Sequence, residues 1–130
     1  MILLDHNIPR DQADLLRRWR VHCSQVGFEV GRPEWEDQEE ILRLLHRLKL
    51  PTFFTRDVGF YRAEYRHPNY CIVVLDGPAL ETVNHIRRFL REPVFRTRAH
   101  RVGGVAKVRA SGIAWWPIGQ RKPVRVNWSG

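Results

Sequence analysis

The chain has 130 residues and a mass of 15.4 kDa, a size that suits one domain with its own hydrophobic core. Hydrophobic residues make up 43% of it and charged residues 28%, which is typical of a globular protein and excludes a membrane-spanning one, since no apolar run approaches the ~20 residues of a span. The first residues already form an apolar strand pattern, so we expect no signal peptide. Cys23 and Cys71 have neither metal-site spacing nor disulfide density, which predicts buried thiols and a cytoplasmic protein.

The positive charge is concentrated at the end of the chain. The formal net charge is +8, yet residues 1–92 contain 14 acidic and 14 basic side chains. Residues 93–130 contain 8 Lys or Arg and no acid. Such asymmetry indicates a polyanionic partner, although a basic tail that only keeps the protein in solution is the simpler alternative.

Strand and helix patterns alternate over the first 92 residues. Apolar runs predict strands at 1–5, 24–28, 51–55 and 70–75. Apolar residues at helical spacing predict helices at 9–20, between Asp37 and Pro51, over a short stretch at 57–65, and at 80–90. This alternation predicts an α/β fold with a central parallel sheet covered on both faces.

The tail has a different pattern. Three β-like runs at 105–108, 113–118 and 124–128 are separated by glycine-containing turns. We expect a small antiparallel β addition at the sheet edge. The 93–130 extension is too short to fold independently, so the whole of 1–130 is predicted to be a single domain.

Three of the predicted strands end in aspartate: Asp5, Asp57 and Asp76. Chemistry in open α/β sheets sits at the carboxyl ends of the strands, so these side chains are candidates for a shared site. A fourth carboxylate is expected from residues 36–40. Clustered carboxylates are tolerated where a hard cation such as Mg²⁺ or Mn²⁺ binds between them, and such an ion can activate water against a phosphodiester.

Each of these residues also has a purely structural interpretation. Asp57 is equally suited to capping the helical turn that follows it, and Asp76 precedes a Gly-Pro turn. The acidic residues at 36–40 suit a helix N-terminus. Asn7 is expected to cap the first helix, with orientation of a substrate phosphate as the alternative. His6 is expected to be an ordinary polar loop residue, with a role as metal ligand or proton donor as the alternative.

Three motifs in this order resemble those of small PIN-like proteins that begin with a DENLP-type motif and are related to PIN-domain and VapC-type ribonucleases. The motifs are Asp5-His6-Asn7-Ile8-Pro9, Asp37-Gln38-Glu39-Glu40-Ile41 and Thr55-Arg56-Asp57-Val58-Gly59-Phe60. The resemblance covers residues 1 to about 92. His6 stands where the family usually has Glu, and Gly59 replaces a second Asp.

The resemblance implies a PIN-like three-layer α/β/α fold and a Mg²⁺- or Mn²⁺-dependent ribonuclease site. By motif match, Asp5, Asp37 and Asp57 would bind the metal and serve catalysis, with Asp76 a looser match. The partners implied are single-stranded RNA and, for a toxin–antitoxin component, an antitoxin protein. The loss of two carboxylates favours the alternative of a catalytically degenerate nucleic-acid-binding or protein-interaction module.

Basic side chains interleaved with aromatic ones predict a surface for single-stranded RNA, bound by charge and stacking. The expected contacts are Arg56, Arg62, Arg98, Arg101, Lys107, Arg109, Trp115, Arg121 and Lys122. Trp115 and Trp116 are neighbours on one predicted strand, so at most one of them can face inward. The other is expected to be exposed or to cover a homodimer interface.

Overall fold

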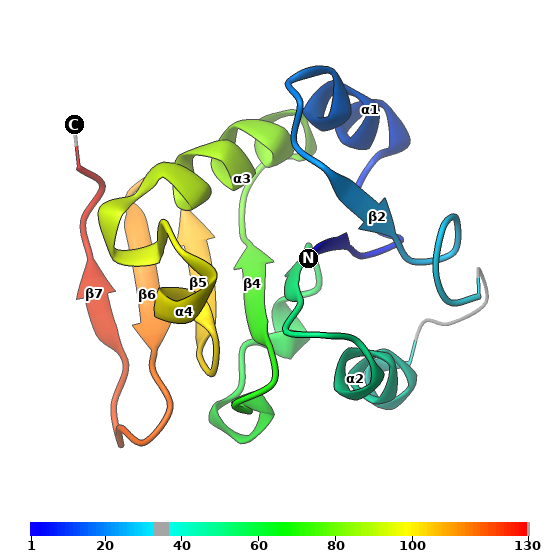
Figure 1. Cartoon of the computed structure of the whole chain (residues 1–130). Helices are drawn as coiled ribbons and strands as arrows, with labels where there is room; N and C mark the ends of the chain where they lie inside the picture. The colour runs from blue at the N-terminus through cyan, green and yellow to red at the C-terminus, as the bar shows by residue number, and fades with distance from the viewer. Residues whose placement is uncertain (33–36, 130) are drawn as a thin grey trace.

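The computed structural model describes residues 1–32 and 37–129. Its centre is one seven-stranded sheet in the order β2-β1-β3-β4-β5-β6-β7 (Figure 1). The strands are β1 (Ile2–Leu4), β2 (Cys23–Gln25), β3 (Thr52–Thr55), β4 (Cys71–Leu75), β5 (Val105–Arg109), β6 (Gly112–Trp116) and β7 (Val124–Val126). The strands from β2 to β5 in this order pair in parallel. β6 pairs antiparallel with both β5 and β7. The α/β class with a mainly parallel sheet is therefore confirmed.

Helices pack on both faces of this sheet. The α-helices are α1 (Arg10–Arg18), α2 (Gln38–Arg47), α3 (Thr82–Arg91) and the short α4 (Arg98–Arg101). Single 3-10 turns are η1 (Val58–Phe60), η2 (Ala63–Tyr65), η3 (Ala79–Glu81) and η4 (Pro93–Phe95). The longest helices in the described ranges have 10 residues, about half of what a bilayer requires, so none of them could span one.

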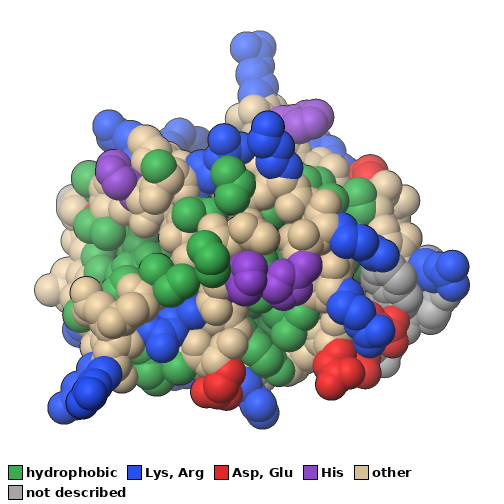
Figure 2. Space-filling view, turned by 60° about the horizontal axis from the view of Figure 1, so that its bottom comes forward, with side chains coloured by type: hydrophobic (Ala, Val, Ile, Leu, Met, Phe, Trp, Pro, Cys, Tyr) green, Lys and Arg blue, Asp and Glu red, His purple; other side chains and the backbone are tan. Residues whose placement is uncertain are grey.

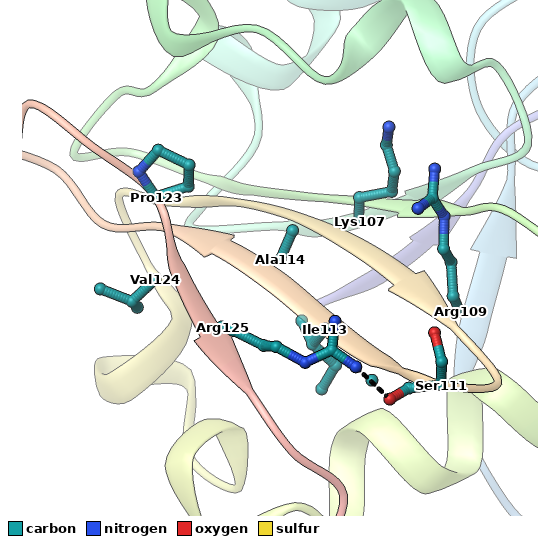
Figure 3. A pocket seen from close by; sticks show the side chains of 9 residues that line it. Lys107, Arg109, Ser111, Ile113, Ala114, Pro123, Val124 and Arg125 are labelled. Carbon is teal, nitrogen blue, oxygen red and sulfur yellow. Dashed lines mark hydrogen bonds between the residues drawn. The ribbon is translucent and has the colours of Figure 1, made fainter.

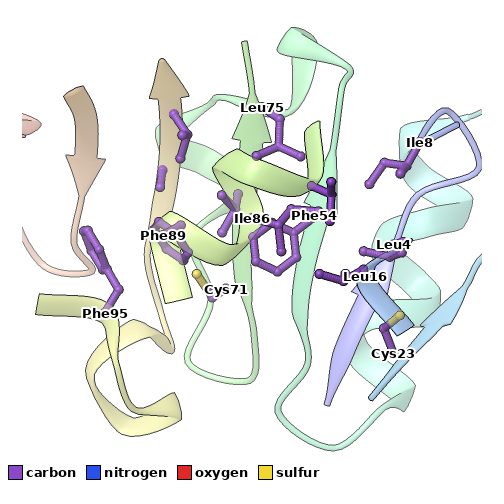
Figure 4. Close-up of a cluster of buried hydrophobic side chains, with 14 of the residues drawn as sticks. Leu4, Ile8, Leu16, Cys23, Phe54, Cys71, Leu75, Ile86, Phe89 and Phe95 are labelled. Atoms are coloured by element: carbon purple, nitrogen blue, oxygen red, sulfur yellow. The ribbon is translucent and has the colours of Figure 1, made fainter. Parts of the chain in front are cut away.

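Two apolar clusters fill the space between helices and sheet. Leu4, Phe54 and Val73 lie on one face under α1 and α3 (Figure 4), while Leu3, Phe53 and Ile72 lie on the other face under α2. These neighbouring residues alternate because successive side chains of a strand point to opposite faces. A strand that is buried on both faces reads as a continuous apolar run, which is why β3 and β4 were recognisable in the sequence.

The tail is part of this core, which corrects the expectation of a purely antiparallel addition. β5 pairs in parallel with β4, with Ile72 opposite Val105. Phe95 is fully buried and stacks on Phe89 of α3 at a ring-centroid distance of 4.5 Å. The charge boundary near residue 93 is therefore not a structural boundary.

The β1/β3 pair lies where the chain changes direction across the sheet. From β1 the chain passes to β2 on one side and then returns to β3 on the other. In open α/β sheets, ligands bind outside the carboxyl ends of the strands at such a switch point. Asp5 and Asp57 follow β1 and β3 and therefore lie at this switch point.

Candidate functional site: a strand-end network and an open basic sheet face

Asp5 is the most deeply buried charged group of the strand ends, with 2% of its surface exposed. Its Oδ2 accepts a hydrogen bond of 2.6 Å from the Thr55 hydroxyl. Its Oδ1 accepts the His6 backbone N–H at 2.8 Å and also lies 2.8 Å from His6 Nδ1. A carboxylate is stable in the interior only with such donors, because an unpaired buried charge costs several kcal/mol.

Thr55 connects the ends of β1 and β3. Its hydroxyl donates to Asp5 and accepts the backbone N–H of Asp57 at 3.0 Å and the side-chain amide of Asn7 at 3.3 Å. Asn7 Oδ1 in turn accepts the backbone N–H of Arg56 at 3.1 Å. Asn7 therefore ties two loops together; the expectation that it caps α1 is wrong, since that helix begins after Pro9 without a side-chain cap.

Asp57 is held from two sides. Its Oδ1 accepts the Gly59 N–H at 2.9 Å, the cap of η1, and its Oδ2 accepts Gln38 Nε2 at 3.1 Å. Gln38 also accepts the Tyr65 hydroxyl at 2.7 Å. A Cβ at Gly59 would lie 2.5 Å from Gln38 Nε2, so glycine at this position leaves room for the amide. We refer to Asp5, His6, Asn7, Gln38, Thr55, Asp57 and their bonds as the strand-end network.

Asp37 and Asp76 have partners outside the strand-end network, although Asp76 follows β4, which is the parallel neighbour of β3. Asp37 is exposed and caps α2 by accepting the Glu39 N–H at 2.9 Å, and its neighbour Gln38 is the residue that reaches Asp57. Asp76 forms an ion pair with Arg109 at 2.7 Å. Of the acidic run 36–40, Glu36 lies outside the described residues.

A Mg²⁺ or Mn²⁺ ion is the cofactor expected at this edge of the sheet. Within 1–32 and 37–129, no three His, Cys, Asp or Glu side chains lie close enough together to hold a metal. The carboxylates of Asp5 and Asp57 already accept bonds from hydroxyl, amide and backbone donors. A hard divalent cation needs several oxygen ligands at once, and the network contains the oxygens of Asp5, Thr55 and Asp57 together with these donors.

A second surface lies on the other half of the sheet, where β5, β6 and β7 turn one face to solvent. Lys107, Ala114 and Arg125 are register partners across these three strands and therefore share a face. Lys107 and Arg109 point to the same side of the sheet, and Ala114 lies between Lys107 and Arg125 (Figure 3). A hollow of about 250 Å³ lies along this row. We call the face formed by Lys107, Arg109, Ala114, Trp116 and Arg125 the open face.

Aromatic rings border the open face. The Tyr61 and Trp116 ring centroids are 6.2 Å apart. Lys107 Nζ lies 5.0 Å from the Tyr61 centroid, and the Arg66 guanidinium lies 5.3 Å from the Trp116 centroid. Burial raises the pKa of Tyr61, so this phenol stays neutral at physiological pH. The surroundings of the open face are thus cationic and aromatic. Figure 2 shows one face of the molecule, on which Lys and Arg side chains outnumber those of Asp and Glu.

Two of the expected RNA contacts are buried inside the fold. Trp115 is 7% exposed and meets Phe95 edge-on at 4.9 Å, while Trp116 lies on the opposite face, so the prediction that only one of the pair faces inward is confirmed. Arg101 is also 7% exposed and donates to Thr52 Oγ1 and to the carbonyl of Phe95. We therefore remove Trp115 and Arg101 from the candidate RNA contacts.

The other expected contacts lie outside the core. Arg98, Arg109, Arg121 and Lys122 are exposed, as is Arg62, whose guanidinium lies 5.7 Å from the Tyr65 centroid. Arg56 is half-buried, and its Nε has no partner among the described atoms. Trp116, Arg66 and Arg125 were missing from that set. The alternation of side chains within 112–116 could have identified Trp116, but only the pairing of β6 with β7 places Arg125 beside Ala114.

Comparison of the chain with family models, with curated proteins and with solved structures gave no match.

Proposed function

We propose that this protein is a PIN-like α/β protein that binds single-stranded RNA on its open face. The observation that carries the proposal is the row Lys107, Ala114 and Arg125, which places a cation on each side of a small side chain across three strands. A small residue between two cations leaves a shallow floor on which a nucleotide can lie. Tyr61, in the loop that follows η1, lies beside this floor.

The cations of the open face are free of buried acidic partners, and Arg125 donates to two neutral acceptors, the Ser111 carbonyl at 2.7 Å and Asn127 Oδ1 at 3.2 Å. Among the described residues, no carboxylate lies within 4.0 Å of the Lys107 ammonium or the Arg125 guanidinium. Arg109 is paired with Asp76, but both side chains are substantially exposed, and exposed pairs contribute only about 0–1 kcal/mol. Backbone phosphates can therefore engage these cations at little cost, with release of condensed counterions as the driving force.

The aromatic border favours unpaired bases. A base stacked on a protein aromatic ring contributes roughly 1–3 kcal/mol. The contact of Lys107 with the Tyr61 ring contributes only about 0.5–1 kcal/mol at exposed sites, whereas Arg66 beside Trp116 also donates hydrogen bonds to the carbonyls of Pro117 and Gln120 at 2.7 and 2.6 Å. A base can therefore take the place of Lys107 on the Tyr61 ring, and the freed ammonium can contact a phosphate. Stacking of this kind requires bases that are not already paired in a duplex.

The test is the affinity for a fluorescent oligouridine of about 12 nucleotides, a length within the range of known single-strand sites. We expect the double variant Lys107→Ala/Arg125→Ala to bind at least about tenfold more weakly than the wild type and to show a smaller salt dependence, because two phosphate contacts are lost. Arg43→Ala/Lys49→Ala is the matched control, since it removes the same charge from α2 and its end, where both side chains are exposed.

Equal weakening in the two double variants would show that only net charge matters and would contradict a site on the open face. Absence of any oligouridine binding by the wild-type protein at low salt would contradict the proposal as a whole. Thermal melting of each variant separates loss of binding from loss of folding.

A second candidate function is metal-dependent ribonuclease activity. One observation favours it: Asp5 and Asp57 lie at the switch point of the sheet and are joined by the Thr55 hydroxyl. We place it second because the described carboxylates are engaged with protein donors. Cleavage of labelled single-stranded RNA that needs Mn²⁺ or Mg²⁺, stops with EDTA and disappears in Asp57→Asn would reverse this order.

A further inference from the structure

A separate group of cations lies on the outer surface of α3, away from the open face. Arg87, Arg88 and Arg91 line a depression of about 350 Å³ together with Asn84, Glu92 and Ser129. The C-terminal segment after β7 closes one side of this depression and lies beside α3 (Figure 1). None of these three arginines belongs to the basic tail, so the overall charge asymmetry of the chain does not reveal them.

Two of the arginines are fixed in place by tryptophan rings. The Arg87 guanidinium lies 4.0 Å from the centroid of Trp19 on α1's C-terminal end, and the Arg88 guanidinium lies 4.4 Å from the centroid of Trp128. Stacking on an indole restricts the long arginine side chain while its N–H groups remain free to donate in the plane of the guanidinium. Less conformational entropy is then lost when an anion binds.

The three arginines also lack acidic partners. Elsewhere on the surface, Arg10 and Arg17 are paired with Asp14 and Glu29. Among the described residues, by contrast, no carboxylate lies within 4.0 Å of the Arg87, Arg88 or Arg91 guanidinium.

Glu92 is the acidic residue that lines the depression, but its side chain is buried. It is 4% exposed, and its two carboxylate oxygens accept the Ser129 N–H at 3.0 Å and the Ser129 hydroxyl at 2.6 Å. These bonds hold the C-terminal segment against α3 and leave the depression dominated by guanidinium groups.

We infer that this depression, which we call the arginine depression, binds phosphate groups. Guanidinium groups match phosphate oxygens in geometry and form charge-assisted hydrogen bonds with them. The inference is independent of the open face, because the residues concerned lie on α3 and the C-terminal segment. A phosphate group can come from a small phosphorylated molecule or from a nucleic-acid backbone, and the experiment separates these sources.

The first arm measures inorganic pyrophosphate binding by isothermal titration calorimetry. We expect Arg88→Ala/Arg91→Ala to weaken it at least about tenfold, the usual scale for loss of charge-assisted hydrogen bonds. Arg43→Ala/Lys49→Ala removes the same charge from α2 and its end and is expected to bind pyrophosphate as the wild type does. Arg88→Lys/Arg91→Lys keeps both charges but loses the planar fork, and we expect an intermediate affinity.

The second arm measures the same oligouridine as above. A further loss of affinity and of salt dependence in Arg88→Ala/Arg91→Ala identifies the backbone as the phosphate source, whereas an unchanged oligouridine affinity identifies a small phosphorylated ligand. The inference is overturned if the wild type does not bind pyrophosphate, or if Arg43→Ala/Lys49→Ala weakens binding as much as Arg88→Ala/Arg91→Ala does. Failure on the open face alone leaves the first arm unaffected, so the two proposals can fail separately.

Discussion

The strand-end network and the open face belong to one sheet but differ in whether their charged side chains have partners of opposite polarity. In the network, the carboxylates of Asp5 and Asp57 are surrounded by hydrogen-bond donors from Thr55, Gln38 and Gly59. On the open face, Lys107 and Arg125 have no acidic partner among the described residues. The first arrangement stabilises the junction of two strands, and the second leaves charge available for a partner. A strand-end aspartate is therefore weak evidence for a metal site until its donors are known.

The largest effect is expected from the two adjacent tryptophans, because they face opposite sides of β6. Trp115→Ala should lower the free energy of unfolding by about 3–5 kcal/mol, the usual range for a buried aromatic residue. Trp116→Ala removes a partly exposed ring and its Nε1 hydrogen bond to the Gln120 carbonyl, so it should lower the free energy of unfolding by clearly less than Trp115→Ala does, while weakening oligouridine binding through the lost stacking surface. Urea unfolding and fluorescence anisotropy of both variants check this pair. A larger loss of stability in Trp116→Ala would contradict the assigned faces.

The hydroxyl of Thr55 is expected to have the next largest effect. Thr55→Val keeps the shape but removes the donor to Asp5 and the acceptor for the Asp57 N–H, leaving buried polar groups unpaired. We expect a loss of about 1–3 kcal/mol in the free energy of unfolding, measured in urea. Thr55→Ser, which keeps the hydroxyl, is the control and should lose clearly less. Equal stability of Thr55→Val and the wild type would show that the network does not stabilise the junction.

Gln38 offers a direct test of whether the strand-end network holds a metal ion. In Gln38→Glu, a carboxylate replaces the amide that lies 3.1 Å from Asp57 Oδ2, so two like charges meet. We expect a loss of about 1 kcal/mol without divalent ions and a rise in melting temperature when Mn²⁺ is added, because the ion relieves the repulsion. Gln38→Ala loses the hydrogen bond without adding charge and should not respond. An equal response of the wild type to Mn²⁺ would show that the native site already binds the ion.

The smallest effect concerns pH. Burial, reinforced by the nearby Arg88 charge, lowers the pKa of His85, while Glu81 opposes this shift. The unfolded chain therefore binds a proton more readily than the folded protein, and stability falls as the pH drops below about 6.5, the ordinary imidazole pKa. Burial lowers the pKa of His67 in the same direction. Urea unfolding of His85→Gln should show a weaker dependence between about pH 7 and pH 5, by less than about 1 kcal/mol. An unchanged pH profile would rule out His85 as a contributor.

Much of the fold was predictable from the sequence because its strands and helices have distinct periodicities. The buried strands β3 and β4 read as apolar runs, and α2 and α3 carry apolar residues at helical spacing. The expected strand at 24–28 is displaced to Cys23–Gln25, and the expected short helix at 57–65 is two 3-10 turns. The parallel pairing of β5 with β4 could not be read from the tail, since strand direction depends on contacts with distant residues.

The site was harder to predict because hydrogen-bond partners do not follow from residue type. Asp37 and Gln38 are adjacent at the start of α2, yet the first caps the helix and the second reaches Asp57. Arg101 is a basic residue in the basic tail, which indicated a surface contact, but it donates a hydrogen bond to Thr52 inside the fold. For Trp115 and Trp116, the alternation of the strand indicated that one faces inward but did not say which.

The most direct test of the central claim is photo-crosslinking of the wild-type protein to an oligonucleotide that contains 4-thiouridine, followed by tryptic digestion and mass spectrometry. If single-stranded RNA lies on the open face, the crosslink should be on the peptide 110–121, which contains Trp116. A crosslink confined to the peptide 1–10, which contains Asp5 and His6, would place the RNA at the strand-end network and contradict our account.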